Sequence, residues 1–191
     1  MSSAPGVLRV LPLGGLGEIG KNMTVFETEG GSFVLDAGLA FPRDEHLGVD
    51  LILPDFSYVR ERAGTVHGVV LTHAHEDHVG ALPYLLRETQ IRDVWGTRLT
   101  LGLVQSKLDE HGLLQEVELH EVRPEDGPVE LGPFRLEFVR MAHSVPDNVA
   151  TMIETGAGRV LHTSDYKIDH TPVDGVKTDV EIGRASCRER V

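Results

Sequence analysis

Six residues, His73 to His78, constrain this chain more than any other part of its sequence. They read His-Ala-His-Glu-Asp-His and follow directly on an apolar run, 69–71, that is typical of a buried strand. Because residues two apart in an extended segment project to the same side, His73 and His75 can hold one metal ion together. The chain then turns into a helix, so Asp77 and His78 can reach a second ion. The alternative is a solvated His-rich turn. The density of the cluster and its place at the end of a strand argue against that alternative.

The cysteine content decides which ligands such ions could have. Cys187 is the only cysteine and no Cys-x-x-Cys exists, so a thiolate metal site and an internal disulfide are both excluded. Imidazole and carboxylate ligands suit zinc when thiolates are absent. The net charge of −12 opposes general adhesion to a phosphate backbone. Two divalent ions would, however, return about four positive charges to one cleft.

Two ions held by four residues would be under-coordinated, so further ligands are expected downstream. His143 closes a predicted strand, and Asp165 lies just past another. A His and an Asp at successive strand ends match a site assembled from loops at one edge of a sandwich. For either residue alone a structural role is at least as plausible. Together with the His cluster they become the fifth and sixth ligands.

The apolar patterns predict a mixed α/β chain with one domain. The predicted strands are 7–13, 22–29, 32–35, 66–71, 116–122, 134–141, 149–155 and 159–163, and the predicted helices are 79–88 and 99–110. The first three strands form a β-meander, turned by Gly30 and Gly31. No run of 18 apolar residues could span a membrane, and residues 1–6 do not resemble a secretory signal, so a cytoplasmic protein is the expectation.

The two ends of the chain differ from its middle. Residues 1–6 are expected to be disordered, and 7–180 to form the domain. The last eleven residues, 181–191 (EIGRASCRERV), show neither apolar periodicity nor turn signals. This string resembles the translated read-through of a sequencing-library adapter, and it is set apart from the fold as a non-native tail; a natural basic tail is the alternative.

The order and spacing of these motifs resemble the metallo-β-lactamase superfamily. Within this superfamily, several short sequence segments are similar to those of the bacterial ribonuclease J family of the β-CASP group. The segments that carry this resemblance are Leu11 to Met23 (LPLGGLGEIGKNM), Leu35 to Gly38 (LDAG), His143 to Asp147 (HSVPD), Asp165 to Asp169 (DYKID) and Thr171 to Val173 (TPV). The resemblance covers Val7 to about Val180. It implies an αββα sandwich, two Zn²⁺ ions and hydrolysis of RNA phosphodiesters.

The resemblance also implies a role for each site residue. His73, His75 and His143 would hold the first zinc, Asp77 and His78 the second, and Asp165 would bridge both. Asp36 would lie behind the ligands, orient the His rings and fix their tautomers. The mechanism implied is two-metal hydrolysis, with Asp77 as the catalytic proton acceptor. No residue is assigned to protonate the leaving group.

The chain also departs from the family's pattern. The family carries a β-CASP insert and a later His ligand of the second zinc, and this chain stops before both. We therefore expect an incomplete sandwich and a second zinc that lacks one protein ligand. RNA is the expected partner, with no membrane and with a possible homo-oligomer in the full-length protein. Exonuclease and endonuclease action both stay open. The alternatives are an inactive metal-binding fragment and a hydrolase of thioesters or lactams with the same fold.

Three further signals carry less weight. Gly15 to Gly20 satisfies G-x-G-x-x-G, but a strand pattern follows instead of the helix that a dinucleotide site needs, so a glycine-rich turn near the metal cleft is preferred. Ser144 and Asp147 adjoin a ligand His, and contact with a phosphate or fixing of the loop are both open. His162 and His170 flank Asp165 and are interpreted as structural.

Overall fold

The structure, a computed structural model, describes residues 6–169, 171, 172, 175 and 178 and consists of two β-sheets that face each other. The first sheet has the strand order β1-β2-β3-β4-β5-β6, and the second has the order β10-β9-β8-β7. The strands of the first sheet are β1 (Arg9–Gly14), β2 (Met23–Thr28), β3 (Gly31–Leu35), β4 (Val66–Val70), β5 (Asp93–Gly96) and β6 (Glu118–Glu121). Those of the second are β7 (Val129–Leu131), β8 (Phe134–Arg140), β9 (Val149–Thr155) and β10 (Gly158–His162).

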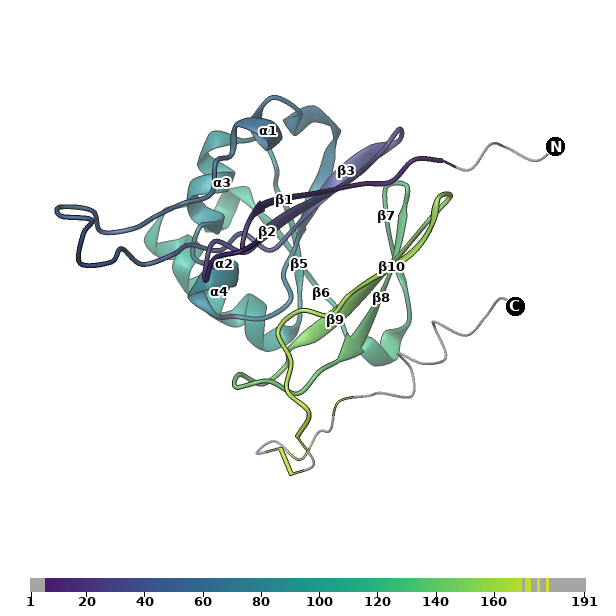
Figure 1. Cartoon of the computed structure of the whole chain (residues 1–191). Helices are drawn as coiled ribbons and strands as arrows, with labels where there is room; N and C mark the ends of the chain where they lie inside the picture. The colour runs from purple at the N-terminus through teal and green to yellow at the C-terminus, as the bar shows by residue number, and fades with distance from the viewer. Residues whose placement is uncertain (1–5, 170, 173–174, 176–177, 179–191) are drawn as a thin grey trace.

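The helices lie on the outer face of the first sheet, and the second sheet covers its inner face (Figure 1). They are α1 (Ser57–Arg60), α2 (Glu76–Val79), α3 (Leu82–Glu88) and α4 (Arg98–Glu110), with single 3₁₀ turns at Ala63–Thr65, Leu114–Glu116 and Pro124–Asp126. One apolar cluster, which includes Leu71, Leu85 and Val104, fills the space between helices and sheet. Because both faces of the first sheet are covered, β3 is buried along its whole length.

A second apolar cluster separates the two sheets. Its centre is aromatic: Phe26 stacks on Phe33 at a centroid distance of 5.2 Å, and Phe33 meets Phe134 edge-on at 4.9 Å. Trp95 packs at the border of this cluster and stacks on His120 at 4.2 Å. The Trp95 indole Nε1 is buried and has no hydrogen-bond partner among the described residues.

The direction of the strands decides where a site can form. β1, β2 and β3 are antiparallel, which confirms the predicted meander, whereas β3, β4, β5 and β6 run parallel. The carboxyl ends of parallel strands meet at one edge of a sheet, and the loops that follow them lie side by side. The loops after β3 and β4, which hold Asp36 and the His cluster, are therefore neighbours.

The structure confirms the fold class and corrects several of its elements. The described residues form three layers of an αββα sandwich: one layer of helices and two β-sheets. The predicted helix 79–88 is wrong as a single element, because α2 and α3 are separate short helices with a break at Gly80–Ala81. Three short elements, α1, β5 and β7, were not predicted. Among the described residues, no helix is long and apolar enough to cross a membrane. The expectations for residues 1–5, for His170 and Cys187, and for the tail 181–191 fall outside the described residues.

Candidate metal centre

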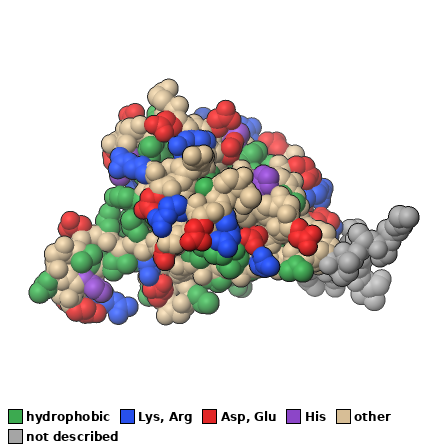
Figure 2. Space-filling view, turned by 90° about the horizontal axis from the view of Figure 1, so that it is seen from above, with side chains coloured by type: hydrophobic (Ala, Val, Ile, Leu, Met, Phe, Trp, Pro, Cys, Tyr) green, Lys and Arg blue, Asp and Glu red, His purple; other side chains and the backbone are tan. Residues whose placement is uncertain are grey.

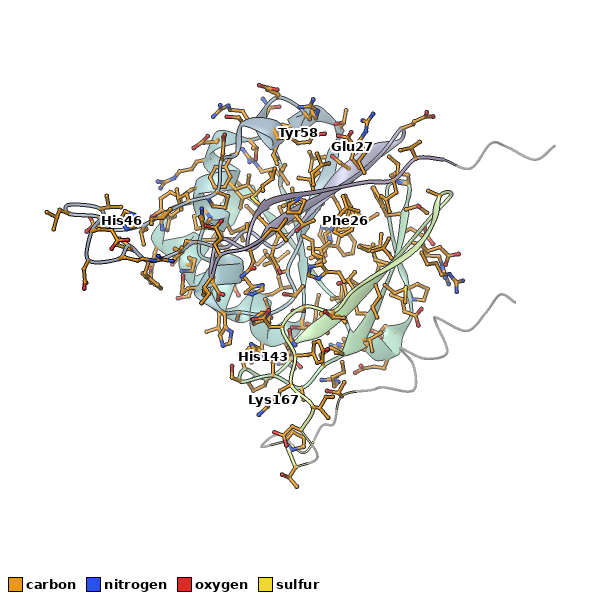
Figure 3. The ribbon with its side chains drawn as sticks, viewed as in Figure 1. Phe26, Glu27, His46, Tyr58, His143 and Lys167 are labelled. Carbon is orange, nitrogen blue, oxygen red and sulfur yellow. The ribbon has the colours of Figure 1, made fainter. Side chains whose placement is uncertain are left out.

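The predicted site residues come together where loops of the two sheets meet. Asp36 follows β3, and His73 to His78 follow β4 and run into α2. From the second sheet, His143 follows β8 and Asp165 follows β10. Figure 3 labels His143 in its loop at the end of the second sheet. Helix α4 fixes the His cluster from outside, because the Lys107 Nζ atom contacts both carboxylate oxygens of Glu76 at 2.8 and 2.9 Å.

Three imidazoles form the first ligand group. His75 Nδ1 lies 3.0 Å from His73 Nε2 and 3.2 Å from His143 Nε2. The three residues offer ligand atoms that all lie within 4.8 Å of one another. A ring nitrogen either donates one proton or accepts one, so His75 Nδ1 cannot make full hydrogen bonds to both neighbours in one tautomer. Three nitrogens that converge in this way suit a shared cation, and this donor set fits zinc.

A second ligand group lies beside the first. His73, His78 and Asp165 offer ligand atoms within 4.8 Å of one another. The Asp165 Oδ2 atom is 3.7 Å from His78 Nε2 and 3.8 Å from His143 Nε2, so this carboxylate stands between the two groups, as a bridging ligand would. Asp77 Oδ2 is 3.8 Å from His78 Nε2, on the side of the second group.

Behind these candidate ligands, the buried carboxylate of Asp36 holds the His78 ring directly and the His73 ring through Thr72. It accepts hydrogen bonds from the Thr72 backbone N–H at 2.8 Å and the Thr72 hydroxyl at 2.9 Å. Its Oδ2 also lies 2.7 Å from His78 Nδ1, so that nitrogen carries the proton and His78 Nε2 is left for a metal. Because the Thr72 hydroxyl donates to Asp36, it can accept from His73 Nδ1 at 3.0 Å, and this leaves His73 Nε2 for the first group.

The environment disfavours the charged form of two first-group rings, those of His73 and His143, in the absence of metal. Burial, reinforced by the neighbouring His78, lowers the pKa of His73 to about 3. Burial and the adjacent His75 likewise lower the pKa of His143. For His78, burial acts in the same direction, but the Asp36 carboxylate outweighs it and raises the pKa above its ordinary value. The Asp36 carboxylate therefore favours the protonated form of His78 in the metal-free chain.

The two residues with open roles, Ser144 and Asp147, both have partners within the protein. Ser144 Oγ lies 3.4 Å from His75 Nε2, on the side of the ring that faces away from the first group. One Asp147 oxygen accepts from the Leu99 backbone N–H at the start of α4, and the other pairs with Arg140 at 3.2 Å. Asp147 thus joins its own loop to α4, and Ser144 lies beside the ring of a candidate ligand.

Several supporting residues escaped the sequence analysis. Asn148 is fully buried, and its side chain donates to the Asp165 backbone oxygen at 2.6 Å and accepts from the Ser164 hydroxyl at 3.0 Å. Ser164 has a left-handed backbone with φ 56°, which starts the turn that presents Asp165. Thr72, directly before His73, and Asn22, at the entrance to β2, complete this set. For Thr72 and Ser164, the one signal in the sequence is that each directly precedes a candidate ligand, His73 and Asp165 respectively.

A cavity of about 240 Å³ opens beside the second group. Its lining includes Asn22, Asp36, His78, His162 and Asp165, together with part of the glycine-rich segment after β1. Strand β2 follows that segment, as predicted, so the helix that a dinucleotide site would need is not there. The glycine-rich turn instead forms one wall of the metal cleft. His162 is a partly buried wall residue whose pKa is lowered by desolvation.

Comparison with known proteins places these residues in a family context. The sequence model of the metallo-beta-lactamase superfamily matches residues 16–179. Ribonuclease J of Helicobacter pylori (strain 26695) is 47% identical over 173 residues, which cover 91% of this chain and 25% of that protein. Ribonuclease J of Thermus thermophilus is 46% identical over 175 residues, which cover 88% of this chain and 30% of that protein. The chain thus spans about a quarter to three tenths of the length of these relatives.

Solved structures share the fold at low identity. The metallo-beta-lactamase fold protein YhfI of Bacillus subtilis superposes with a TM-score of 0.62 at 20% identity, covering 86% of this chain and 65% of that one. The short form of human tRNase Z superposes with a TM-score of 0.54 at 15% identity, covering 82% of this chain and 68% of that one.

Proposed function

The chain belongs to the metallo-β-lactamase superfamily, and from that membership and its converging side chains we propose that it is the metal-binding part of a zinc-dependent ribonuclease of the ribonuclease J type. One observation carries the proposal. The ring nitrogens of His73, His75 and His143 meet within hydrogen-bond distance, and Asp165 Oδ2 lies between them and His78. Two adjoining groups that share a carboxylate are what a pair of divalent ions needs.

Each residue of the centre has a definite task in this proposal. When bound, two zinc ions would supply Lewis-acid stabilisation of the phosphate and a readily deprotonated water. His73, His75 and His143 hold the first position, His78 and Asp77 the second, and Asp165 joins them. Asp36 fixes which nitrogen of His78 is free. Asp77 is the candidate catalytic proton acceptor, because its side chain keeps 35% of its surface exposed and so remains open to water.

RNA is the proposed substrate. Its support is the name of the relatives, ribonuclease J, at 44–47% identity over about nine tenths of the chain. The protein offers no broad basic face in the view of Figure 2, where acidic and basic side chains are interspersed. Attraction of a phosphate would therefore depend on the charge of the bound ions. Within this proposal the protein acts in cytoplasmic RNA processing and decay, by 5′–3′ exonuclease or endonuclease cleavage.

The test is hydrolysis by the chain itself. The zinc-loaded chain is incubated with an end-labelled single-stranded RNA, and the products are separated by size. We expect slow cleavage that needs zinc and is lost in His73→Ala, which removes a first-group ligand. Hydrolysis of a thioester or β-lactam with intact RNA would contradict the proposal in favour of another hydrolase. Firm zinc binding with no turnover of any substrate would favour an inactive metal-binding fragment.

A further inference from the structure

Asn22 joins the glycine-rich segment after β1 to the metal centre. Its backbone N–H donates to the Asp77 carbonyl oxygen at 3.0 Å, and its own carbonyl accepts from the Gly38 N–H at 2.9 Å. Gly38 approaches the His cluster so closely that a Cβ there would collide with the Asp77 carbonyl oxygen. The Asn22 backbone is therefore held between the loop that follows β3 and helix α2.

The side-chain amide of Asn22 faces the second ligand group. Its Nδ2 atom lies 3.0 Å from the Asp77 backbone oxygen, 3.2 Å from Asp77 Oδ2 and 3.0 Å from His78 Nε2. His78 Nδ1 already carries the ring proton that it shares with Asp36, so His78 Nε2 is an acceptor when the ring is neutral. Two N–H bonds thus face three acceptors. A cation that takes up the lone pair of His78 Nε2 leaves one acceptor for each N–H.

The other side of the amide is closed by the glycine-rich segment. A Cβ at Gly15 would collide with Asn22 Oδ1, and Gly15 itself has a left-handed backbone with φ 80°. The absence of a side chain at this position lets the loop pack directly on the amide, so that Nδ2 stays turned toward Asp77 and His78. This gives the G-x-G-x-x-G pattern a structural role that the proposed mechanism had not used.

We propose that Asn22 is a positioning residue for the second metal ion. It holds the Asp77 carboxylate through Nδ2 and leaves His78 Nε2 to the ion, while Gly15 keeps the amide in that orientation. The inference rests on the proposed function, since it assumes two ions. Removal of a group that orients metal ligands typically weakens metal binding by about 10–100-fold.

The experiment separates the two ions by titrating the metal-free 191-residue chain with Zn²⁺ against a chromophoric chelator. Asn22→Ala should weaken the second binding step by about 10–100-fold and leave the first within about twofold. Ser144→Ala is the matched control, because Ser144 contacts the outer nitrogen of His75 in the first group. It should leave the second step unchanged. Equal second-step constants for Asn22→Ala and the unaltered chain would overturn the inference, and so would equal losses in both steps.

Two further measurements keep these outcomes distinct. Near-ultraviolet circular dichroism in chelator shows whether Asn22→Ala folds; if it does not, Asn22→Ser takes its place, since a hydroxyl keeps one of the two donors. A smaller loss in the second step is then expected, and no loss overturns the inference. If the unaltered chain binds fewer than two ions, the two-ion function fails as well. If the unaltered chain binds two ions and the Asn22 variants bind each ion as tightly as the unaltered chain does, only the proposed role of Asn22 fails.

Discussion

At the scale of the residue, Asp36 combines two unfavourable states. Its carboxylate is almost fully buried, and its backbone is left-handed with φ 62°, a conformation that costs a non-glycine residue about 1–2 kcal/mol. Burial raises the pKa of the carboxyl, but the charge of His78 and the hydrogen bonds of His78 and Thr72 outweigh it and hold the pKa below its ordinary value. The cost is offset by contacts that at the same time orient two ligand rings.

Asp36→Asn should therefore affect both metal affinity and stability. Thr72 and His78 direct N–H and O–H donors at both carboxylate oxygens of Asp36. The NH₂ group of an asparagine would therefore face a donor in either orientation, and that hydrogen bond would be lost. We expect the metal-free chain to lose about 2–3 kcal/mol of unfolding free energy and zinc affinity to fall about 10–100-fold. Urea denaturation and zinc titration measure the two effects. Asp55→Asn is the control: Asp55 is an exposed carboxylate that accepts a hydrogen bond from the Ser57 backbone N–H at 2.9 Å, an amide oxygen can accept in its place, and neither quantity should change appreciably. Equal behaviour of the two variants would argue against the assigned role.

His73 gives the metal-free chain a pH dependence of known sign. Its pKa of about 3 in the folded chain lies below the 6.5 of an unperturbed His, so the unfolded chain binds this proton first as the pH falls. The unfolding free energy should thus decrease between pH 6.5 and about 3, by at most about 1.4 kcal/mol per pH unit for this proton. His78 acts oppositely: its raised pKa adds stability that is present below pH 6.5 and is lost as the pH rises through the folded value. Denaturation in chelator at several pH values should show a smaller slope below pH 6.5 for His73→Gln than for the unaltered chain. An identical slope would mean that His73 is not buried as described.

At the scale of the element, the approach of the loop after β3 to α2 determines how the ligands are presented. The Ala37 and Leu39 backbone N–H groups donate to the carbonyl oxygens of His78 and Glu76, at 2.7 and 3.1 Å. Between them, Gly38 leaves no room for a side chain next to Asp77. The loop after β3 and helix α2 are thus hydrogen-bonded backbone to backbone, with no side chain between them at Gly38.

Two glycine variants test this close approach against a position without it. Gly38→Ala should cost about 1–3 kcal/mol of unfolding free energy, as overpacking does, and should weaken zinc binding because α2 must move. Gly102→Ala lies inside α4, where a Cβ would meet nothing within 4 Å, and should stabilise the chain by about 0.5–1 kcal/mol. Thermal and urea unfolding of both variants gives the comparison. A harmless Gly38→Ala would show that the loop can relax away from α2.

The elements that the sequence predicted well are those with a long apolar pattern. α4 and β9 differ from their predicted ranges by at most one residue at either end, whereas β5 has four residues and starts with Asp93, too short and too polar for a pattern to appear. The candidate site residues likewise differ in how clearly the sequence marks them. Among the candidate ligands, His73, His75 and His78 stood out because they are dense in the sequence, and His143 and Asp165 because each lies just past a predicted strand. Asn22 and Asn148 did not, because an amide next to a turn is common and only packing shows which one faces a metal ligand.

At the scale of the whole molecule, the candidate metal centre draws its residues from both sheets. His73 to His78 belong to loops of the first sheet, and His143 and Asp165 to loops of the second. A ligand that binds only the folded chain stabilises it by mass action, and here the unfolded chain cannot bring these segments together. At free zinc of about 100 times the dissociation constant, the unfolding free energy should rise by about 2.7 kcal/mol per site.

Urea denaturation with zinc and with chelator measures this rise. His143→Ala should reduce it, because it removes the contribution of the second sheet to the first group, while the cooperativity of the transition should be unaffected. An unfolding free energy independent of zinc in the unaltered chain would mean that the ligands do not form a site in the folded protein.

Trp95 gives the interior of this sandwich an optical signal. It is the only tryptophan of the chain, and its indole lies at the border of the apolar cluster between the sheets, stacked on His120 and with no hydrogen-bond partner for Nε1 among the described residues. Indole emission shifts to longer wavelength when water reaches the ring. The fluorescence of the unaltered protein should therefore report any separation of the sheets without an added dye. Energy transfer from its three tyrosines to Trp95 would give a second fluorescence signal in the same measurement.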